Sequence, residues 1–528
     1  MSRMTKYLNQ IITGNVFDTP EILEKYSTDK SALKIMPKLV AFPESTADIQ
    51  KILKFINQLA LKNLKIETAV RGSGLDETGA DLTTGLVISM EKLNKLEEFD
   101  GRERLVRVQA GITLKELNTA LSVSGLTIPV KANENETIGS LIANCPTDDY
   151  GFKYNGIMRY IERAEIVLAN GECIQTDRIG ARTIAKKQAE KTLEGNIYSG
   201  LLNCAEKHAT AIQNIKNAGF DSAGYPTITA AVKKDSIDLL PLMFTSEGTL
   251  GIISEVILHA EVIPSKPVHM ITTFSSLKSA LNFMNEALKL KPLELNIVDL
   301  RILKTAEEYG KNLSKVTRKL QSGYTVYVSF NDKALKANKK LRECAANVPT
   351  TSNCIVEDEK TTPIINEFKN SIESYLNMPS DGERFPLLSN FFVPKENFAK
   401  FLKELTVLEQ KLRIEMPIFG SYATCNFSIR PKFKLDAQNA EKRIETFLRA
   451  GNLIIERNGG SLTGGSPEGR IKAIISNKTM PADQKALYKE IKNLFDPNGI
   501  LNASIKLGAD TSFTLKHLKT TKTPRRML

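Results

Sequence analysis

The sequence contains few of the side chains that usually hold metal clusters or act as general bases. Its six cysteines lie far apart, and it has neither a Cys-x-x-Cys pair nor a histidine at metal-ligand spacing. This argues against an iron–sulfur cluster and against structural zinc. The four histidines belong to no recognisable motif, so we interpret His208, His259, His269 and His517 as ordinary surface or core residues.

Long apolar stretches are absent as well. No run reaches the ~18 consecutive apolar residues of a membrane span, and the first residues have no apolar core of the signal-peptide type. We therefore expect a cytoplasmic protein.

The composition is that of a globular protein, with 41% hydrophobic and 25% charged residues. At roughly 100 to 200 residues per domain, a chain of 528 residues forms about two to four domains. The net charge of +12 comes from 72 basic and 60 acidic residues, and part of it is local. The end of the chain has no acid and reads as a solvated basic tail with weak affinity for anionic surfaces; its basic residues are Lys516, Lys519, Lys522, Arg525 and Arg526.

A glycine loop follows the first predicted strand. The apolar spacing after Ser45 predicts a helix over 46–61, and residues 64–70 read as a buried strand that runs into Arg71-Gly72-Ser73-Gly74. A phosphate loop of the P-loop or Rossmann kind opens directly into a helix. Here residues 76–84 are turn-like and 86–90 form another strand, which argues against a nicotinamide-dependent hydride carrier.

Strands and helices continue to alternate along the chain. Thr113 and Glu116 form a capping box for a helix to about residue 124. Thr137 precedes a small, apolar segment, like the start of a buried helix whose amides could face an anion. The pattern predicts an α+β fold, with these parts: an N-terminal segment 1–35, an α+β domain 36–262, a second α+β domain 263–410, a segment 411–510 that ends this domain and returns to the first, and a basic tail 511–528.

Three motifs in this order resemble a known family. They are RGSG at 71, TSEGTLGIISEVIL at 245 and LFDPNGILN at 494. The chain resembles the FAD-linked oxidases of the vanillyl-alcohol oxidase and p-cresol methylhydroxylase (PCMH) type. Within that group it is most similar to the D-2-hydroxy acid dehydrogenases related to D-lactate and glycolate oxidases. The similarity covers roughly residues 36–262 and 411–506.

The resemblance implies a two-subdomain PCMH-type FAD-binding domain with a ferredoxin-like α+β cap domain. It implies that residues 72–75 cradle the pyrophosphate, that Thr137 and Gly139 supply amides, and that Asn502 lies near the flavin ring. Gly248, Gly251 and Ile253 would line the adenine and ribose side. The FAD-binding residues expected from it are Arg71, Gly72, Ser73, Gly74, Leu75, Thr137, Gly139, Ile142, Ala143, Gly248, Gly251, Ile253 and Asn502. Because no histidine lies in the glycine loop or in residues 139–156, we expect FAD to be bound non-covalently.

The sequence departs from the family where the metal would be held. Metal-dependent relatives carry histidines in a Gly-Asn-x-His strand and a Glu-His pair after a Gly-Gly segment. Here the corresponding positions are Ser421, Ser428, Gly465 and Ser466. Hydroxyl groups are poor substitutes for imidazole as transition-metal ligands, so we expect a site without a metal.

Without a metal, another group must hold or deprotonate the substrate. Tyr422 and Tyr154, with Tyr150 beside it, are candidate bases if nearby cations lower their pKa, although ring packing is the ordinary role of such residues. Four cations could lower such a pKa or hold a substrate carboxylate or phosphate, with solvated surface charge as their alternative role: Arg430, which we count among the candidate catalytic residues, Lys432, Arg470 and Lys472.

The predicted function is that of an FAD-dependent oxidoreductase that takes hydride from a small alcohol or 2-hydroxy acid. Two alternatives stay open: a flavin-binding electron-transfer or sensing protein without dehydrogenase activity, and a dehydrogenase that meets a membrane surface through the basic tail. The electron acceptor is not indicated, and we expect no nucleic-acid partner.

Overall fold

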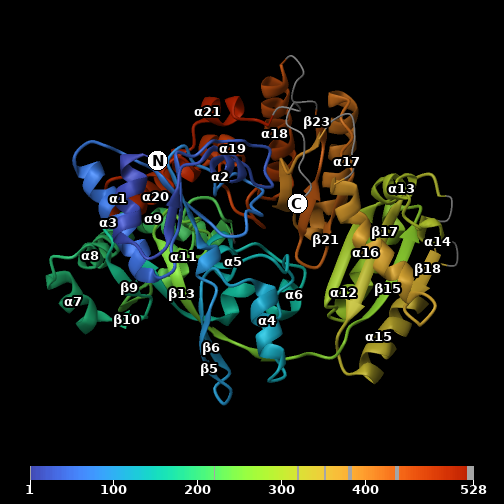
Figure 1. Cartoon of the computed structure of the whole chain (residues 1–528). Coiled ribbons are helices and arrows are strands. Elements are labelled where there is room, and N and C mark those ends of the chain that lie inside the picture. Colours follow the sequence, from blue (N-terminus) through green and yellow to red (C-terminus); the bar gives the residue numbers. More distant parts are fainter. Residues whose placement is uncertain are drawn as a thin grey trace.

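The computed structural model describes residues 2–218, 221–317, 320–349, 353–377, 383–433 and 439–519. Helices and strands alternate through the chain (Figure 1), which confirms the α+β class. None of the described helices is long and apolar enough to cross a membrane. In the predicted basic tail, α21 (Thr511–Lys516) buries Leu515, and Lys519 donates to the carbonyls of Asp29 and Ser31. The expectation of a solvated tail is therefore wrong for residues 511–519, and residues 520–528 lie outside the described part.

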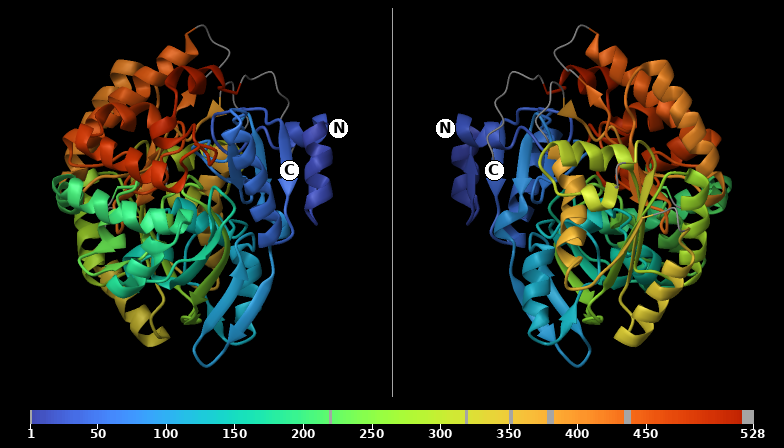
Figure 2. Two further views of the ribbon diagram at one scale, coloured as in Figure 1. Left: turned by 90° about the vertical axis from the view of Figure 1, so that its left-hand side faces the viewer. Right: turned by 90° about the vertical axis from the view of Figure 1, so that its right-hand side faces the viewer.

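The first domain contains two main sheets. In the smaller one, β2 and β3 both run parallel to β4 and β1 is antiparallel to β2. Its strands, in spatial order, are β1 (Asn15–Phe17), β2 (Leu39–Phe42), β4 (Leu86–Ser89) and β3 (Thr68–Arg71). The second sheet is antiparallel, in the order β5 (Leu96–Asp100), β6 (Leu105–Gln109), β13 (Ile252–His259), β8 (Ile161–Val167) and β9 (Cys173–Gln175). Figure 2 shows the β5–β6 hairpin extending away from the body of the molecule.

Helix starts in this domain follow the sequence signals. Ser45 caps α3 (Thr46–Leu61), and Thr113 with Glu116 forms the predicted capping box of α4 (Leu114–Ser122). The strand expected over 64–70 is shorter than predicted. Leu64 follows the end of α3, is 60% exposed, and lies outside the ladder that starts at Thr68. An apolar run can therefore predict a strand that is too long when its first residues form the connection from the preceding helix.

The second domain is built on a seven-stranded antiparallel sheet. Its order is β18 (Asn353–Val356), β15 (Val268–Phe274), β17 (Tyr324–Phe330), β16 (Glu294–Asp299), β21 (Ile418–Ser421), β22 (Asn426–Ile429) and β20 (Leu388–Phe392). The first four strands in the chain take the spatial order 4-1-3-2, which is the ferredoxin-like arrangement expected of the cap. The helices around the sheet are α12 (Leu277–Lys289), α13 (Leu300–Glu308), α15 (Ala334–Ala346), α16 (Thr362–Asn377) and α17 (Lys395–Leu412).

After α18 (Ala440–Arg457) the chain returns to the first domain. It passes through α19 (Ala473–Thr479) and α20 (Ala482–Phe495), and its backbone then pairs with β3. Thr68 donates its amide to the Ile500 carbonyl, and Asn502 donates its amide to the Thr68 carbonyl, both at 2.7 Å. The domain limits proposed from the sequence stay a prediction, but this pairing places residues 500–502 beside the start of β3, the strand that leads into the glycine loop.

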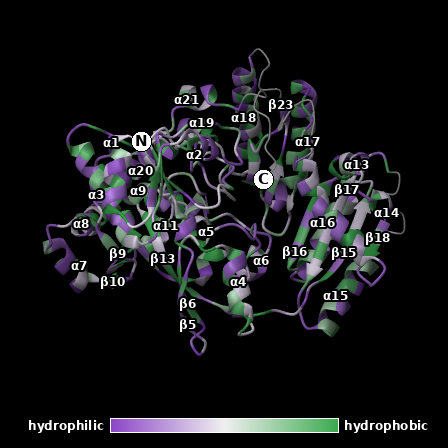
Figure 3. Cartoon of the chain, viewed as in Figure 1, coloured by the Kyte–Doolittle hydropathy of each residue, from purple (hydrophilic) through white to green (hydrophobic). Residues whose placement is uncertain are grey.

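Two large apolar cores are buried, and the one under the cap sheet also contains Leu33 and Leu82 from the first part of the chain. One cluster of buried side chains fills the first domain and includes α20, and another joins the cap sheet to α17 and α18. In Figure 3 hydrophobic residues follow central strands such as β13, whereas the outer helix α7 (Ala181–Ala189) is mostly hydrophilic. Loops that connect these elements form a cleft in the first domain.

Candidate FAD site

A cleft opens in the first domain where three separate stretches of the chain meet. Together with open solvent at its mouth, it contains about 750 Å³ of space that no protein atom occupies. Ten of the residues expected to bind FAD line it: Gly72, Ser73, Gly74, Leu75, Thr137, Gly139, Ala143, Gly248, Gly251 and Ile253. Residues more than 170 positions apart thus come together, from the glycine loop, the start of α5 and the motif at 245, whereas no described residue of the motif at 494 lines the cleft.

The glycine loop offers unused hydrogen-bond donors to the cleft. Among the described residues, none accepts a hydrogen bond from the backbone amides of Gly72, Ser73, Gly74 or Leu75. Gly74 has a φ of +71°, a conformation that favours glycine. Successive free amides of this kind form a concave anion site, so the loop fits the diphosphate of FAD.

Helix α5 (Ile138–Asn144) offers fewer free amides to the cleft than the sequence suggested. Thr137 caps it, with its hydroxyl accepting from the Ser140 amide at 3.3 Å. The Gly139 amide, however, donates to the Ala110 carbonyl at 2.7 Å, so it is not available to an anion. The prediction that Gly139 supplies an amide is therefore wrong. Its role is close packing, since an added Cβ would lie 2.9 Å from the Ala110 Cβ.

Three other expected residues support the cleft from outside it and do not line it. The Arg71 guanidinium packs under Gly74 and lies 3.6 Å from the Asp81 carboxylate. Ile142 is fully buried in the core. Asn502 was expected near the flavin ring, but its side-chain amide donates to the carbonyls of Ala80 at 2.7 Å and Glu247 at 2.9 Å. It fixes two lining loops relative to each other.

A fully buried ion cluster holds the third lining loop in place. Glu247 has a φ of +52°, and its carboxylate accepts from the amides of Glu468 and Gly469 at 2.9 and 2.7 Å. The Lys506 ammonium lies 2.9 Å from Glu247 and 3.5 Å from the Glu468 carboxylate. Burial alone would lower the pKa of Lys506, but the two carboxylates raise it above its usual value. The cluster thereby joins the lining loop at Glu247 to the return segment at Glu468 and to Lys506.

The candidate catalytic tyrosines do not have the expected properties. Tyr422 is buried in the cap core, where its hydroxyl donates to Asn285 and its ring lies against Phe398. Burial raises its pKa to about 12, so the expectation of a lowered pKa is wrong. Tyr154 accepts a hydrogen bond from the Asn331 amide at 2.8 Å, and burial raises its pKa as well. Burial also raises the pKa of Tyr150.

Arg430 lies near the glycine loop and keeps one donor unused. Only 7% of the residue is exposed, and its Nη2 pairs with Glu77 at 2.5 Å. Its buried Nε has no hydrogen-bond partner among the described residues. A buried guanidinium with a free N–H is suited to bind a carboxylate.

The residues at the family's metal-ligand positions are engaged with the protein. Ser428 accepts from the Asn390 amide at 2.9 Å, and the Ser421 hydroxyl accepts from the Thr424 amide at 3.4 Å. A Cβ at Gly465 would lie 1.7 Å from Asn426 Oδ1, so no longer side chain fits there. Lys472 donates to Ser466 and to the carbonyls of Ser389 and Leu462, and burial lowers its pKa to about 8.

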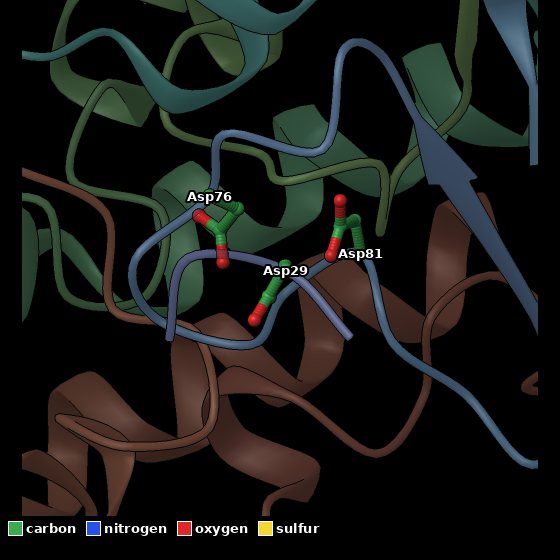
Figure 4. Close-up of side chains that lie close together, drawn as sticks. All are labelled: Asp29, Asp76 and Asp81. Carbon is green, nitrogen blue, oxygen red and sulfur yellow. The ribbon is translucent and has the colours of Figure 1, made fainter. Parts of the chain in front are cut away.

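Carboxylates are the lining groups that sequence reasoning missed. Asp76, Asp81, Glu136 and Glu247 line the cleft, and none of the described lining residues is lysine, arginine or histidine. Asp76, Asp81 and Asp29 each place one oxygen within 4.8 Å of the others (Figure 4), and this is the group in the described chain that could hold a cation. The signal was present in the sequence, because RGSGLDETGAD puts two aspartates directly after the glycine loop.

Comparison with known proteins identifies both domains. Residues 37–177 match the FAD binding domain, and residues 263–505 match the C-terminal domain of FAD linked oxidases. In fold, the chain is similar to 4-ethylphenol oxidase from Gulosibacter chungangensis, with a TM-score of 0.68 over 96% of this chain and 98% of that one at 14% identity.

Three relatives illustrate the similarity in sequence. D-2-hydroxyglutarate dehydrogenase from Haemophilus influenzae is 22% identical over 90% of this chain, but only 48% of that protein is covered. The chain therefore spans about half the length of this relative. D-lactate dehydrogenase from Archaeoglobus fulgidus is 24% identical over 91% of this chain and 94% of that one. The glycolate oxidase subunit from Bacillus subtilis is 25% identical over 88% of each.

Proposed function

Because the chain belongs to the FAD-linked oxidases, with FAD as its cofactor, we propose that it oxidises the CH–OH group of a small 2-hydroxy acid or alcohol without a divalent metal. The observation that carries the proposal is the run of four unpartnered amides in residues 72–75. These amides would hold the diphosphate. When bound, the flavin supplies the hydride acceptor, and the chain supplies binding and orientation.

We propose that the substrate carboxylate is held by Arg430. Its free Nε–H and its burial support this role, since a charge-assisted hydrogen bond is stronger away from water. The relatives named above act on D-2-hydroxyglutarate, D-lactate and glycolate, and all three carry a carboxylate beside the reacting hydroxyl. A cytoplasmic location and a membrane-surface contact of the tail are also proposals, and the electron acceptor is left open.

Anaerobic reduction tests this function. The FAD-loaded protein, kept in a chelator, is mixed with D-lactate, glycolate or D-2-hydroxyglutarate, and the oxidised flavin absorbance is followed. We expect at least one of these acids to bleach the flavin, and we expect the chelator to leave the rate unchanged. Bleaching that occurs only after a divalent metal is added would contradict the metal-free site.

A second candidate function is electron transfer or sensing without dehydrogenase activity. It is favoured by the hydroxyls of Ser421, Ser428 and Ser466, which are all engaged within the protein. Flavin that stays oxidised with every hydroxy acid but is bleached by dithionite would support this candidate over the first.

Substitution of Gly72 by alanine tests the cofactor site itself. The new Cβ would lie 2.4 Å from the Thr137 hydroxyl, which would have to leave the Ser140 amide that it caps. We expect Gly72→Ala to weaken FAD binding at least ~10-fold and to destabilise the protein by about 1 to 3 kcal/mol. Gly180→Ala is the matched control, because its Cβ would meet nothing closer than 3.9 Å. Fluorescence titration with FAD distinguishes the two, and equal affinities would contradict the placement of FAD.

A further inference from the structure

The lining of the proposed diphosphate cleft is acidic, although its ligand is an anion. Its lining includes four carboxylates, whereas none of the described lining residues is basic. Lys506 neutralises one of them, Glu247, and Arg71 lies beside a second, Asp81. Asp76 and Glu136 have no ion pair with any described residue. A diphosphate brought to this cleft adds two further negative charges in a partly desolvated place, where repulsion is strong.

Glu136 is the less constrained of these two acids. It directly precedes the cap Thr137, lines the cleft and is half-buried. Its carboxyl group has no hydrogen-bond partner among the described residues, so protonating it breaks nothing. Asp76 differs, because its carboxylate accepts from the amides of Thr78 and Ala80 at 2.9 and 2.8 Å.

The surroundings of both acids favour the neutral form. Burial, together with Asp81, raises the pKa of Asp76 to about 7, and burial, together with Asp76 and Glu77, raises the pKa of Glu136 to about 7. Burial and the same aspartates also raise the pKa of Asp29. The charged groups that face this region from other elements include the acids Asp29, Asp81, Glu77 and Glu247 and the cations Arg71, Arg430, Arg470, Lys472, Lys506 and Lys519. Three of these cations, Arg71, Arg430 and Lys506, are already paired with Asp81, Glu77 and Glu247.

We propose that Glu136 binds FAD in its protonated form, so that binding of the cofactor takes up a proton and Glu136 donates a hydrogen bond to a diphosphate oxygen. This inference rests on the proposed FAD site. A neutral carboxylic acid is a donor, whereas a carboxylate only accepts. The proton taken up with FAD therefore removes the repulsion between the Glu136 carboxylate and the diphosphate. It also lets the same carboxyl group donate a hydrogen bond to the diphosphate.

FAD binding is expected to tighten as the pH falls. An acid that is partly ionised in the free protein and protonated in the complex makes binding tighter as the pH falls. Above pH 7 the dissociation constant of FAD is expected to rise up to about tenfold per pH unit for each proton taken up. Below pH 6 it is expected to level off, because Glu136 is then protonated before FAD arrives.

The test is fluorescence titration of the apoprotein with FAD at pH 6, 7 and 8, at constant ionic strength and in a chelator. Glu136→Gln keeps a hydrogen-bond donor without the charge, so we expect it to bind FAD about tenfold more tightly than the natural protein at pH 8 and equally well at pH 6. Glu134→Gln is the matched control, because it removes the same charge two residues away on an exposed side chain that does not line the cleft. It should leave the affinity within about twofold at every pH.

Each other outcome is informative. A dissociation constant that does not change with pH, or a Glu136→Gln protein no tighter than the control at pH 8, would overturn the inference while leaving FAD binding intact. Tight binding at pH 8 that requires added Mg²⁺ would show that a cation, held by Asp29, Asp76 and Asp81, takes the place of the proton. Absence of FAD binding at every pH would overturn the proposed FAD site as well.

Discussion

Replacing Lys506 by methionine is expected to lower the free energy of unfolding by about 3 to 5 kcal/mol, the range found when one partner of a buried ion pair is removed. The ammonium is 1% exposed, and both carboxylates that it serves, Glu247 and Glu468, are fully buried. Methionine fills a similar volume but leaves two like charges facing each other. Urea unfolding at an unchanged m-value measures the loss.

The loss from Lys506→Met should also depend on pH, with a definite sign. In the natural protein burial already raises the pKa of Glu468, although Lys506 opposes this. Without the ammonium that pKa rises further, so the folded variant binds a proton that the unfolded chain releases. Stability of the variant must then fall as the pH rises from about 5 to 8. A destabilisation that stays constant over this range would contradict the ion cluster.

Two further variants separate charge from packing. Lys478→Met, on a side chain that is 42% exposed and pairs with Glu445, should change stability by less than ~1 kcal/mol. Adding Glu468→Gln to Lys506→Met removes the surplus charge and should recover part of the lost stability, because the residues are directly coupled. If the double variant were less stable than Lys506→Met alone, the cost would come from packing and the electrostatic explanation would be wrong.

Local signals in the sequence predicted the frame of the FAD site well. The capping box at Thr113 and Glu116, the cap at Thr137 and the loop that begins at Gly72 all depend on residues within a few positions of one another. Such contacts are fixed by short-range geometry, so they can be read without knowing the rest of the fold.

The direction of individual side chains could not be read in the same way. Tyr422 directly follows β21, and which face of the sheet it meets depends on register with β16 and on packing by α17. Asn502 belongs to a family motif, yet its amide serves two loops that lie 255 and 422 residues away along the chain. The pKa of a tyrosine likewise follows its burial, which is set by residues far away in sequence.

Arg430 carries the largest expected effect on catalysis. Arg430→Gln is expected to lower kcat/KM for a 2-hydroxy acid about 100-fold, equivalent to about 2.7 kcal/mol of transition-state binding. The guanidinium is 7% exposed and its Nε has no partner within the described chain, so a substrate carboxylate would receive a charge-assisted hydrogen bond there. Rapid mixing with the substrate under anaerobic conditions measures flavin reduction directly.

The control variants for Arg430 separate substrate binding from support of the loop. Glu77→Gln breaks the ion pair but keeps the guanidinium, so its kcat/KM should fall much less than that of Arg430→Gln. Arg430→Lys keeps the charge but loses the planar guanidinium, so its kcat/KM should lie between those of Glu77→Gln and Arg430→Gln. Arg449→Gln, on a helix side chain that is 62% exposed, should behave as the natural protein does. At pH 6, where Glu136 is protonated, FAD affinity should be the same in all four variants, because neither Arg430 nor Glu77 lines the cofactor cleft. If Glu77→Gln lost as much activity as Arg430→Gln, Arg430 would act by holding the loop at Glu77, and another group would have to bind the carboxylate.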